Sequence, residues 1–539
     1  MSANPLDARH GLLKTALCRC ALLMAALLLA SAARAQGHFG SSPFVPPDKN
    51  DITFVVDQAP GLDTGCTFRS GGPLVFVIKT TRFVGETNAD GTLKNAAQLV
   101  ANGVISATAK LSLPGFDVDY DATPPPPFNP ERDQLLFNGQ PVDFLRGVNN
   151  AWIMNSFEIP IERVKFPARG ANGQLPTPAE NTIVVNIDVA NVDEIWCTAV
   201  DWASLTIKAL SPVILVHGNN SAGAFFDRQG FTNTLRTRRI PFDNSIAMPT
   251  ETIAAHSARL DSLIPDIVKS FGTDSVHLVA HSKGGLDSRD YLANYQAAHD
   301  NDFKVLSLTT LSTPHNGSVL ADLKVEYDAA AAAASYVTFV GFPGMTKSLA
   351  KLSSLDAGTT NLTTGFVAGF NAANLPRLPA ATVFNTVAAD ADTNGNAAID
   401  STPDEYADLR TESSALANVQ AVSTALARNI VDAMYQILRN TTAVTVVLTP
   451  HPIVVAGVTL GTVTTATLSS VATATALGND TLVTLPSGRG EGGLAGRVSN
   501  TFSFTGAAGR NHSNVANGGV ASTVLPWLFS IERSSGDLR

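Results

Sequence analysis

The chain has 539 residues, of which 45% are hydrophobic and 15% are charged, and its formal net charge is −9 at pH 7. A chain this long and this apolar can fill more than one sizeable core, which excludes a disordered protein and predicts two folded units. The negative charge argues against a nucleic acid partner, because a phosphate backbone repels an acidic surface.

Residues 1–35 have the pattern of an export signal. Basic residues from Arg9 to Arg19 precede an apolar run over 21–30, and an Ala-Arg-Ala sequence then ends at Ala35. The run is shorter than the roughly 20 residues that span a bilayer, which favours a cleaved signal over a transmembrane anchor. We therefore expect cleavage near Ala35 and a secreted protein, either extracellular or periplasmic.

The chain has four cysteines, and two of them, Cys18 and Cys20, lie inside the predicted signal. The other two, Cys66 and Cys197, would meet an oxidising compartment, where pairing is the usual outcome. We expect a disulfide between them, with two buried free thiols as the alternative. The spacing of the cysteines and histidines fits no zinc site.

Residues 36–209 have the pattern of an all-β domain. Apolar runs such as "PLVFVIKTTRFVG" and "NTIVVNIDV" alternate with segments rich in Gly, Pro, Asn and Asp, which is typical of a β-sandwich. The Asn138-Gly139 pair inside "LLFNGQPVDF" predicts a hairpin turn. A disulfide between Cys66 and Cys197 would join the two ends of this region.

Residues 210–539 alternate strands with helices. The apolar strand "PVILVH" precedes a helix in which apolar residues recur at helical spacing from Leu260 to Phe271. The strand "VHLVAH", a helix beginning near Lys283 and the strand "KVLSLTTL" follow in that order. This order predicts a mostly parallel sheet with helices on both faces.

Two inserts interrupt the alternation, near residues 318–380 and 441–479. The first contains an alanine run that predicts a helix, and the second has no Asp, Glu, Lys or Arg and is rich in Thr, Val and Ala, which suits β-hairpins. Two interpretations stay open for these inserts: ordinary core or subunit packing, and a lid or substrate-facing surface.

A single serine stands where the strand "VHLVAH" gives way to a helix. Ser282 has Ala280 and Gly284 two residues to either side, and such small residues let the chain turn sharply and present the serine Oγ at the sheet edge. A serine before a helix can also be an N-cap only. The motif thus indicates either a nucleophile or a cap.

The stretches "PVILVHGNN", "VHLVAHSKGG" and "LSTPHNGS" together resemble the α/β-hydrolase superfamily, close to bacterial secreted triacylglycerol lipases, over residues 210–539. The usual elbow is G-x-S-x-G, and Ala280 replaces its first glycine, as in a subset of these lipases. The resemblance implies an α/β-hydrolase fold, preceded here by a smaller, jelly-roll-like β-sandwich, and a Ser-His-Asp mechanism with Ser282 as the nucleophile.

The same resemblance implies the other groups of the site. The backbone N–H groups of Lys283 and Asn219 would hold the oxyanion. In "GRNHSNVANGG", His512 precedes a predicted closing helix and is the expected base. For His217, His281 and His315 we expect structural roles.

The acid has two candidates. Asp480 in "GNDTLV" resembles the "NDG" stretch of the lipases, with Thr481 in place of the glycine, and it comes before the histidine as triad order requires. Asp390 is the alternative. The stretch that starts at Asp390 also begins like a calcium-binding loop, with Asp390, Asp392 and Asn394 as alternate oxygen ligands. Its twelfth position is Ser401 instead of the usual Glu. A structural calcium site and a plain Asx-rich turn therefore both stay open.

We therefore expect a secreted serine ester hydrolase, a lipase or carboxylesterase, that acts on lipid at an interface and needs no cofactor for its chemistry. One alternative is an extracellular polyester depolymerase, such as one for polyhydroxyalkanoates. An alternative of another class is a surface binding protein with an inactive hydrolase domain, in which the N-terminal region, similar to jelly-roll modules of the galactose-binding type, does the binding. Chain-length preference, oligomeric state, a dedicated foldase and an acyl acceptor other than water leave no pattern in the sequence.

Overall fold

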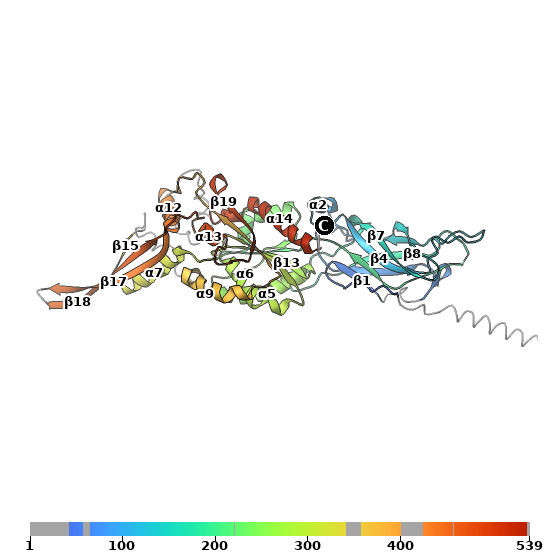
Figure 1. Ribbon diagram of the computed structural model, residues 1–539, viewed down its shortest axis with the longest axis horizontal. Helices are drawn as coiled ribbons and strands as arrows, with labels where there is room; N and C mark the ends of the chain where they lie inside the picture. Colours follow the sequence, from blue (N-terminus) through green and yellow to red (C-terminus); the bar gives the residue numbers. More distant parts are fainter. Residues whose placement is uncertain are drawn as a thin grey trace, which may run out of the picture.

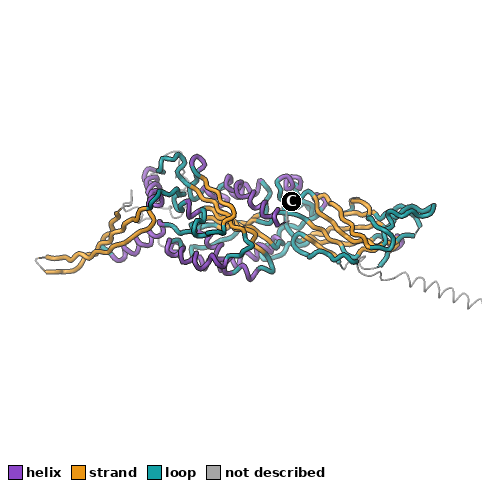
Figure 2. The backbone as a smooth tube through the Cα atoms, viewed as in Figure 1, coloured by secondary structure: helices purple, strands orange, loops and turns teal. Residues whose placement is uncertain are grey.

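The computed structural model describes residues 42–57, 65–193, 195–219, 221–340, 357–399, 424–455 and 458–535, so the predicted signal lies outside the described residues. Figure 1 shows an elongated molecule with β-sheets of the N-terminal region at one end, a sheet flanked by helices in the middle, and a β-hairpin at the other end. Figure 2 shows the same three parts by secondary structure.

The N-terminal region contains two antiparallel sheets. One sheet contains β1 (Thr53–Val56), β2 (Thr67–Phe68), β4 (Thr108–Phe116), β7 (Trp152–Pro160), β9 (Cys197–Val200) and β10 (Ala203–Thr206). The other contains β3 (Leu74–Thr80), β5 (Gln134–Phe137), β6 (Gln140–Phe144) and β8 (Ala179–Asn186). Buried side chains from both sheets belong to one hydrophobic core, as expected for a β-sandwich. Between β5 and β6, Asn138 and Gly139 both have positive φ, which confirms the predicted hairpin turn.

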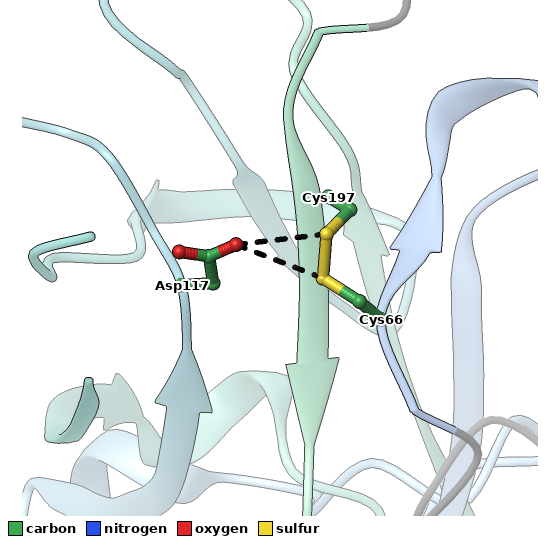
Figure 3. A group of neighbouring side chains, drawn as sticks. All are labelled: Cys66, Asp117 and Cys197. Carbon is green, nitrogen blue, oxygen red and sulfur yellow. Dashed lines mark hydrogen bonds between the residues drawn. A yellow bond between two sulfur atoms is a disulfide. The ribbon is translucent and has the colours of Figure 1, made fainter. Parts of the chain in front are cut away.

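The predicted disulfide between Cys66 and Cys197 is present, with a Cα–Cα distance of 5.3 Å. Figure 3 shows the carboxylate of Asp117 beside it, with Oδ2 3.7 Å from the Sγ of Cys197. Among the described residues, these three side chains form the one cluster of His, Cys, Asp or Glu that is close enough to share a metal ion. Because the two sulfurs are bonded to each other, they offer no thiolate to a metal.

Replacing both cysteines with serine is expected to destabilise the N-terminal sheets. The disulfide closes a loop with a sequence separation of 131 residues, and constraining a loop of that length in the unfolded chain is worth about 4 kcal/mol. Urea unfolding followed by tryptophan fluorescence measures the loss. An unchanged unfolding midpoint would show that packing alone holds the two ends of the region together.

The middle of the molecule is an open parallel sheet. Its strands, in spatial order, are β12 (Phe242–Asp243), β11 (Val213–Val216), β13 (Ser275–His281), β14 (Lys304–Leu311), β16 (Val383–Ala389) and β19 (Val498–Phe504). Every neighbouring pair is parallel. All four residues of β11 are buried, because helices cover both faces of the sheet.

The packing of β11 shows how the helices divide between the two faces. Val213 and Leu215 pack in one hydrophobic cluster, while Ile214 and Val216 pack in another. The first cluster includes α3 (Ala224–Arg228), α4 (Phe231–Thr237) and α14 (Gly518–Ser535), and the second includes α5 (Ile253–Phe271) and α6 (Lys283–Asn294). The predicted mostly parallel sheet with helices on both faces is therefore confirmed.

The long helix α5 shows how local sequence sets an element's limits. The hydroxyl of Thr252 accepts a hydrogen bond from the N–H of Ala255 and caps the first turn. Gly272 ends the helix with a φ of 62°, a conformation that glycine adopts without strain. Its apolar residues pack against β13, as their helical spacing predicts.

The N-terminal sheets and one face of the parallel sheet share a core. A single hydrophobic cluster includes Leu205 of β10, Val213 of β11 and Leu528 of α14. Beside it, the N–H of Ser211 donates to the buried carboxylate of Glu532, with an N–O distance of 2.6 Å. The connection between the two regions is therefore packed in the interior.

The two predicted inserts meet in a small three-stranded sheet. Its strand order is β15 (Tyr336–Val340), β18 (Val458–Ala472) and β17 (Thr441–Val455), and it packs on α7 (Val319–Ala333) and α12 (Thr424–Asn440). The uncharged segment forms one hairpin of two 15-residue strands. The remaining helices are α2 (Ala96–Ala101), α8 (Ala357–Thr360), α9 (Thr364–Asn374) and α13 (Leu485–Gly488). None of the helices in the described ranges is both long enough and apolar enough to span a membrane.

Candidate active site

Ser282 lies on a sharp turn between β13 and α6. Its φ of 54° and ψ of −132° are unusual for a residue with a side chain. Two hydrogen bonds hold the turn: the N–H of Ser282 donates to the carbonyl of Leu311 at 2.9 Å, and the hydroxyl of Thr313 donates to the carbonyl of Ser282 at 2.9 Å. Strained backbone that the surroundings hold in this way is concentrated at functional sites.

Small residues allow this turn to pack closely. A side chain at Gly284 would collide with the carbonyl of His217, and a Cβ at Gly218 would lie 2.8 Å from the Cβ of Ser282. Ala280, which takes the place of the usual first glycine, is fully buried in the cluster between the sheet and α5. The structure therefore accommodates the methyl group of Ala280 at the elbow.

The structure brings Ser282, His512 and Asp480 together in one chain of hydrogen bonds. The Nε2 of His512 lies 2.9 Å from the Oγ of Ser282, and its Nδ1 lies 2.9 Å from Oδ2 of Asp480. The other carboxylate oxygen, Oδ1, accepts from the N–H groups of Leu482 and Val483 at 2.9 and 2.7 Å. A carboxylate that only accepts is suited to orient an imidazole with its proton on Nδ1.

The alternative acid, Asp390, has other partners. Its Oδ1 accepts from the hydroxyl of Tyr435 at 3.1 Å, and burial raises its pKa. The histidine contacts Asp480 and not Asp390 through Nδ1. The geometry therefore favours Asp480 as the acid.

Thr481, which stands where the lipases have glycine, has a φ of 83°. This region strains a β-branched residue, and among the described residues the buried hydroxyl of Thr481 has no hydrogen-bond partner. Thr481→Gly is therefore expected to raise the free energy of unfolding by about 1 kcal/mol. Glycine relieves the backbone strain, and this gain exceeds the cost of the extra entropy that glycine gives the unfolded chain. Thermal unfolding measures this effect, and a lower melting temperature would contradict it.

Of the two expected oxyanion donors, Lys283 follows Ser282 in the chain, and Asn219 follows a glycine that packs against that serine. Lys283 is the first residue of α6, where the helix dipole favours negative charge. Asn219 follows Gly218, the residue that packs against Ser282. The side chain of Lys283 is fully buried and lies 2.7 Å from Oδ1 of Asp287, so the proposed role of Lys283 belongs to its backbone N–H.

Sequence reasoning missed the buried ionic cluster under the elbow. The Nζ of Lys283 also lies 2.7 Å from Nδ1 of His256, and that nitrogen lies 2.9 Å from Oδ2 of Asp287. The i, i+4 spacing of Lys283 and Asp287 on one helix was the available signal. His256 comes from α5, so only the packing of α5 against α6 brings it into the cluster.

His217, His281 and His315, for which we expect structural roles, are all buried. Burial lowers the pKa values of His217, His281 and His315. His281 Nε2 lies 2.7 Å from the carbonyl oxygen of His512, and donating to it holds the backbone of the candidate base. No pattern in the sequence indicated this contact, because His281 and His512 lie far apart in the chain.

The proposed calcium loop has the contacts of an Asx-rich turn. The two carboxylate oxygens of Asp392 accept from the N–H groups of Gly395 and Ala397, both at 2.7 Å. Asn394 likewise accepts from the N–H of Asn396 at 2.9 Å. Ser401 lies outside the described residues, and calcium binding stays a prediction.

The parallel six-stranded sheet, the helices on its two faces and the serine turn after β13 define an α/β-hydrolase fold. No family model matches the chain. Triacylglycerol lipase 2 from Saccharomyces cerevisiae is 38% identical over 93 residues, which are 17% of this chain and 27% of the yeast protein. The match thus spans about a quarter of that relative's length.

The solved structures that are similar to this chain include the following two. The mature form of the lipase BlEst2 from Bacillus licheniformis has 19% sequence identity and a TM-score of 0.37, over 59% of this chain and 92% of that one. EstA from Clostridium botulinum has 12% identity and a TM-score of 0.34, over 60% of this chain and 88% of that one. The fold assignment rests on the strand order and the turn at Ser282.

Proposed function

We propose that this chain is a secreted serine hydrolase of carboxylic esters that acts on lipid substrates. The observation that carries the proposal is the continuous hydrogen-bonded chain from Ser282 through His512 to Asp480, with the serine at a strained turn. This arrangement supplies a nucleophile, a base and an orienting acid, which acyl transfer requires. The reaction needs no cofactor.

The proposed reaction has two halves. The Oγ of Ser282 attacks the ester carbonyl carbon while its proton passes to Nε2 of His512, and the N–H groups of Asn219 and Lys283 hold the oxyanion. The tetrahedral intermediate then collapses, and His512 gives the proton to the leaving alcohol. Water attacks the acyl-enzyme with His512 as base, which releases the carboxylic acid and restores the serine.

Asp480 has two tasks in this scheme. It keeps the proton of the neutral imidazole on Nδ1, so that Nε2 can accept from the serine. It also stabilises the imidazolium that forms during each half-reaction. Its full burial excludes water that would compete for its oxygen.

A fluorophosphonate ester probe tests the proposal. The mature chain is treated with the probe, and peptide mass spectrometry locates the label beside a Ser282→Ala control. Labelling at Ser282 together with turnover of p-nitrophenyl butyrate is the expected result. A folded chain that takes no label and hydrolyses no ester would favour the binding-protein alternative.

A further inference from the structure

The hairpin of β17 and β18, here called the arm (residues 441–472), extends beyond the body of the molecule. Figures 1 and 2 show it at the end opposite the N-terminal sheets. Residues 441–479 contain no Asp, Glu, Lys or Arg, although the whole chain has 37 basic and 46 acidic residues. A projecting segment without charge is unusual at a surface in water.

The inner half of the arm packs on the protein. Val444 and Val446 contact the cluster that contains Leu323 of α7, and Ala466 and Leu468 of β18 are buried in it. This half is thus an ordinary layer of sheet on helix.

The outer half, here called the outer arm (residues 447–455 and 458–465), exposes apolar side chains on both faces. Leu448 and Val454 lie on the same face as Val446 and are 49% and 56% exposed. On the opposite face, Val447 is 56% exposed and Ile453 is 42% exposed. A two-stranded ribbon of this kind is only marginally stable in water, which indicates that another apolar phase covers it.

The β17 edge of the outer arm does not favour pairing with another strand. β17 pairs only with β18 among the described strands, and Pro450 and Pro452 stand opposite Thr464 and Thr462. Being two residues apart, the two proline nitrogens lie on the same side of the strand. Because proline cannot donate to a ladder, these two positions hinder a further strand from adding to this edge. The other edge is covered by β15 only from Thr465 to Ser469, so the two faces of the ribbon are the surfaces on which the proposal rests.

The arm is attached beside the candidate active site. The hydroxyl of Ser318, the residue before α7, donates to the carbonyl of Leu482 in the acid loop at 2.8 Å. A second hydrogen bond closes the base of the hairpin. The N–H of Leu477, which is three residues before Asp480, donates to the carbonyl of Arg439, which precedes β17, at 2.9 Å. The base of the arm is therefore joined to the loop that carries Asp480.

We propose that the outer arm inserts into the surface of an uncharged oil phase and anchors the enzyme on its ester substrate. Inserting it leaves no Asp, Glu, Lys or Arg to be desolvated, and its His451 is counted as neutral at pH 7, whereas a charged membrane surface or a charged protein would find few ion-pair partners there. The proposal rests on the proposed function, because it names the physical state of the substrate of that site.

The test compares two triple variants of the full chain. The arm variant carries Val447→Thr, Ile453→Thr and Val454→Thr, which add hydroxyls while keeping β-branched residues that favour strands. The control variant carries Val45→Thr, Val148→Thr and Val192→Thr, three valines of the N-terminal region that are at least half exposed. Flotation with triolein droplets measures binding, turnover of soluble p-nitrophenyl butyrate measures the chemistry, and light scattering measures the molar mass.

We expect the arm variant to lose about tenfold or more in droplet partitioning, which corresponds to about 1.4 kcal/mol. The control variant should float like the unchanged chain, and all three proteins should turn over the soluble ester equally. Equal flotation of the arm variant would overturn the proposal. A dimer of the unchanged chain that becomes a monomer in the arm variant would also overturn it, by assigning the arm to a second copy.

Binding to phosphatidylserine vesicles without binding to triolein would also overturn the proposal, because the surface would then be a charged membrane. Failure of the proposed function gives a different result. In that case the unchanged chain would not turn over the soluble ester, while flotation would still report on the arm.

Discussion

Replacing His512 with alanine is expected to lower kcat for p-nitrophenyl butyrate hydrolysis about 10⁶-fold, the size seen when a triad base is removed. The physical reason is the 2.9 Å contact between Nε2 and the Oγ of Ser282, through which the hydroxyl proton leaves. Without that acceptor the serine stays a weak nucleophile, and water has no base to help it attack the acyl-enzyme. Steady-state kinetics with a thermal unfolding check measures the effect.

His299→Ala is the matched control for this variant. His299 also contacts a carboxylate, with Nε2 2.7 Å from Oδ1 of Asp261, but it lies after α6 and its side chain is 21% exposed. We expect its activity to remain within about threefold of the unchanged chain. If His512→Ala kept activity in that range too, the base would have to be another group.

Replacing Asp480 with asparagine is expected to lower kcat about 10⁴-fold, with little change in structure. The new amide can keep accepting the N–H groups of Leu482 and Val483 through its oxygen, and it then presents its NH₂ to Nδ1 of His512. The Nδ1 atom must then accept a hydrogen bond from this NH₂ group, so the proton of the neutral imidazole moves to Nε2. A protonated Nε2 cannot take the proton of Ser282.

Asp390→Asn separates the two candidate acids. Because Asp390 contacts Tyr435 and not the histidine, its variant is expected to lose less than about tenfold in kcat. The same assay on both variants decides the assignment. A large loss for Asp390→Asn beside a small one for Asp480→Asn would reverse it.

Local sequence was enough to predict the main architecture of the chain. Apolar runs that alternate with helical periods predict a parallel sheet with two covered faces, and the packing of β11 into two clusters confirms it. The Asn138-Gly139 turn and the pairing of Cys66 with Cys197 were also predicted. The turn depends only on residues adjacent in the sequence, and the disulfide was predictable because only two cysteines lie outside the predicted signal.

The sequence also predicted the sharp turn at Ser282, because the geometry of a strand-to-helix turn is encoded within five residues. His512 and Asp480 were predicted through their resemblance to lipase stretches, since nothing local shows that two residues 32 apart meet. Between Asp480 and Asp390 the sequence favoured the first, because "GNDTLV" resembles the "NDG" stretch of the lipases. The structure supplies the physical criterion, which is the carboxylate that faces Nδ1.

Only the tertiary structure decided the contacts that cross between elements. The bond from His281 to the carbonyl of His512, and the cluster of Lys283, His256 and Asp287, depend on how the loop before α14 and helix α5 pack against the elbow. The uncharged composition of the arm was evident in the sequence, but its exposure on both faces was not. Periodicity describes one element at a time, whereas burial depends on which other elements lie against it.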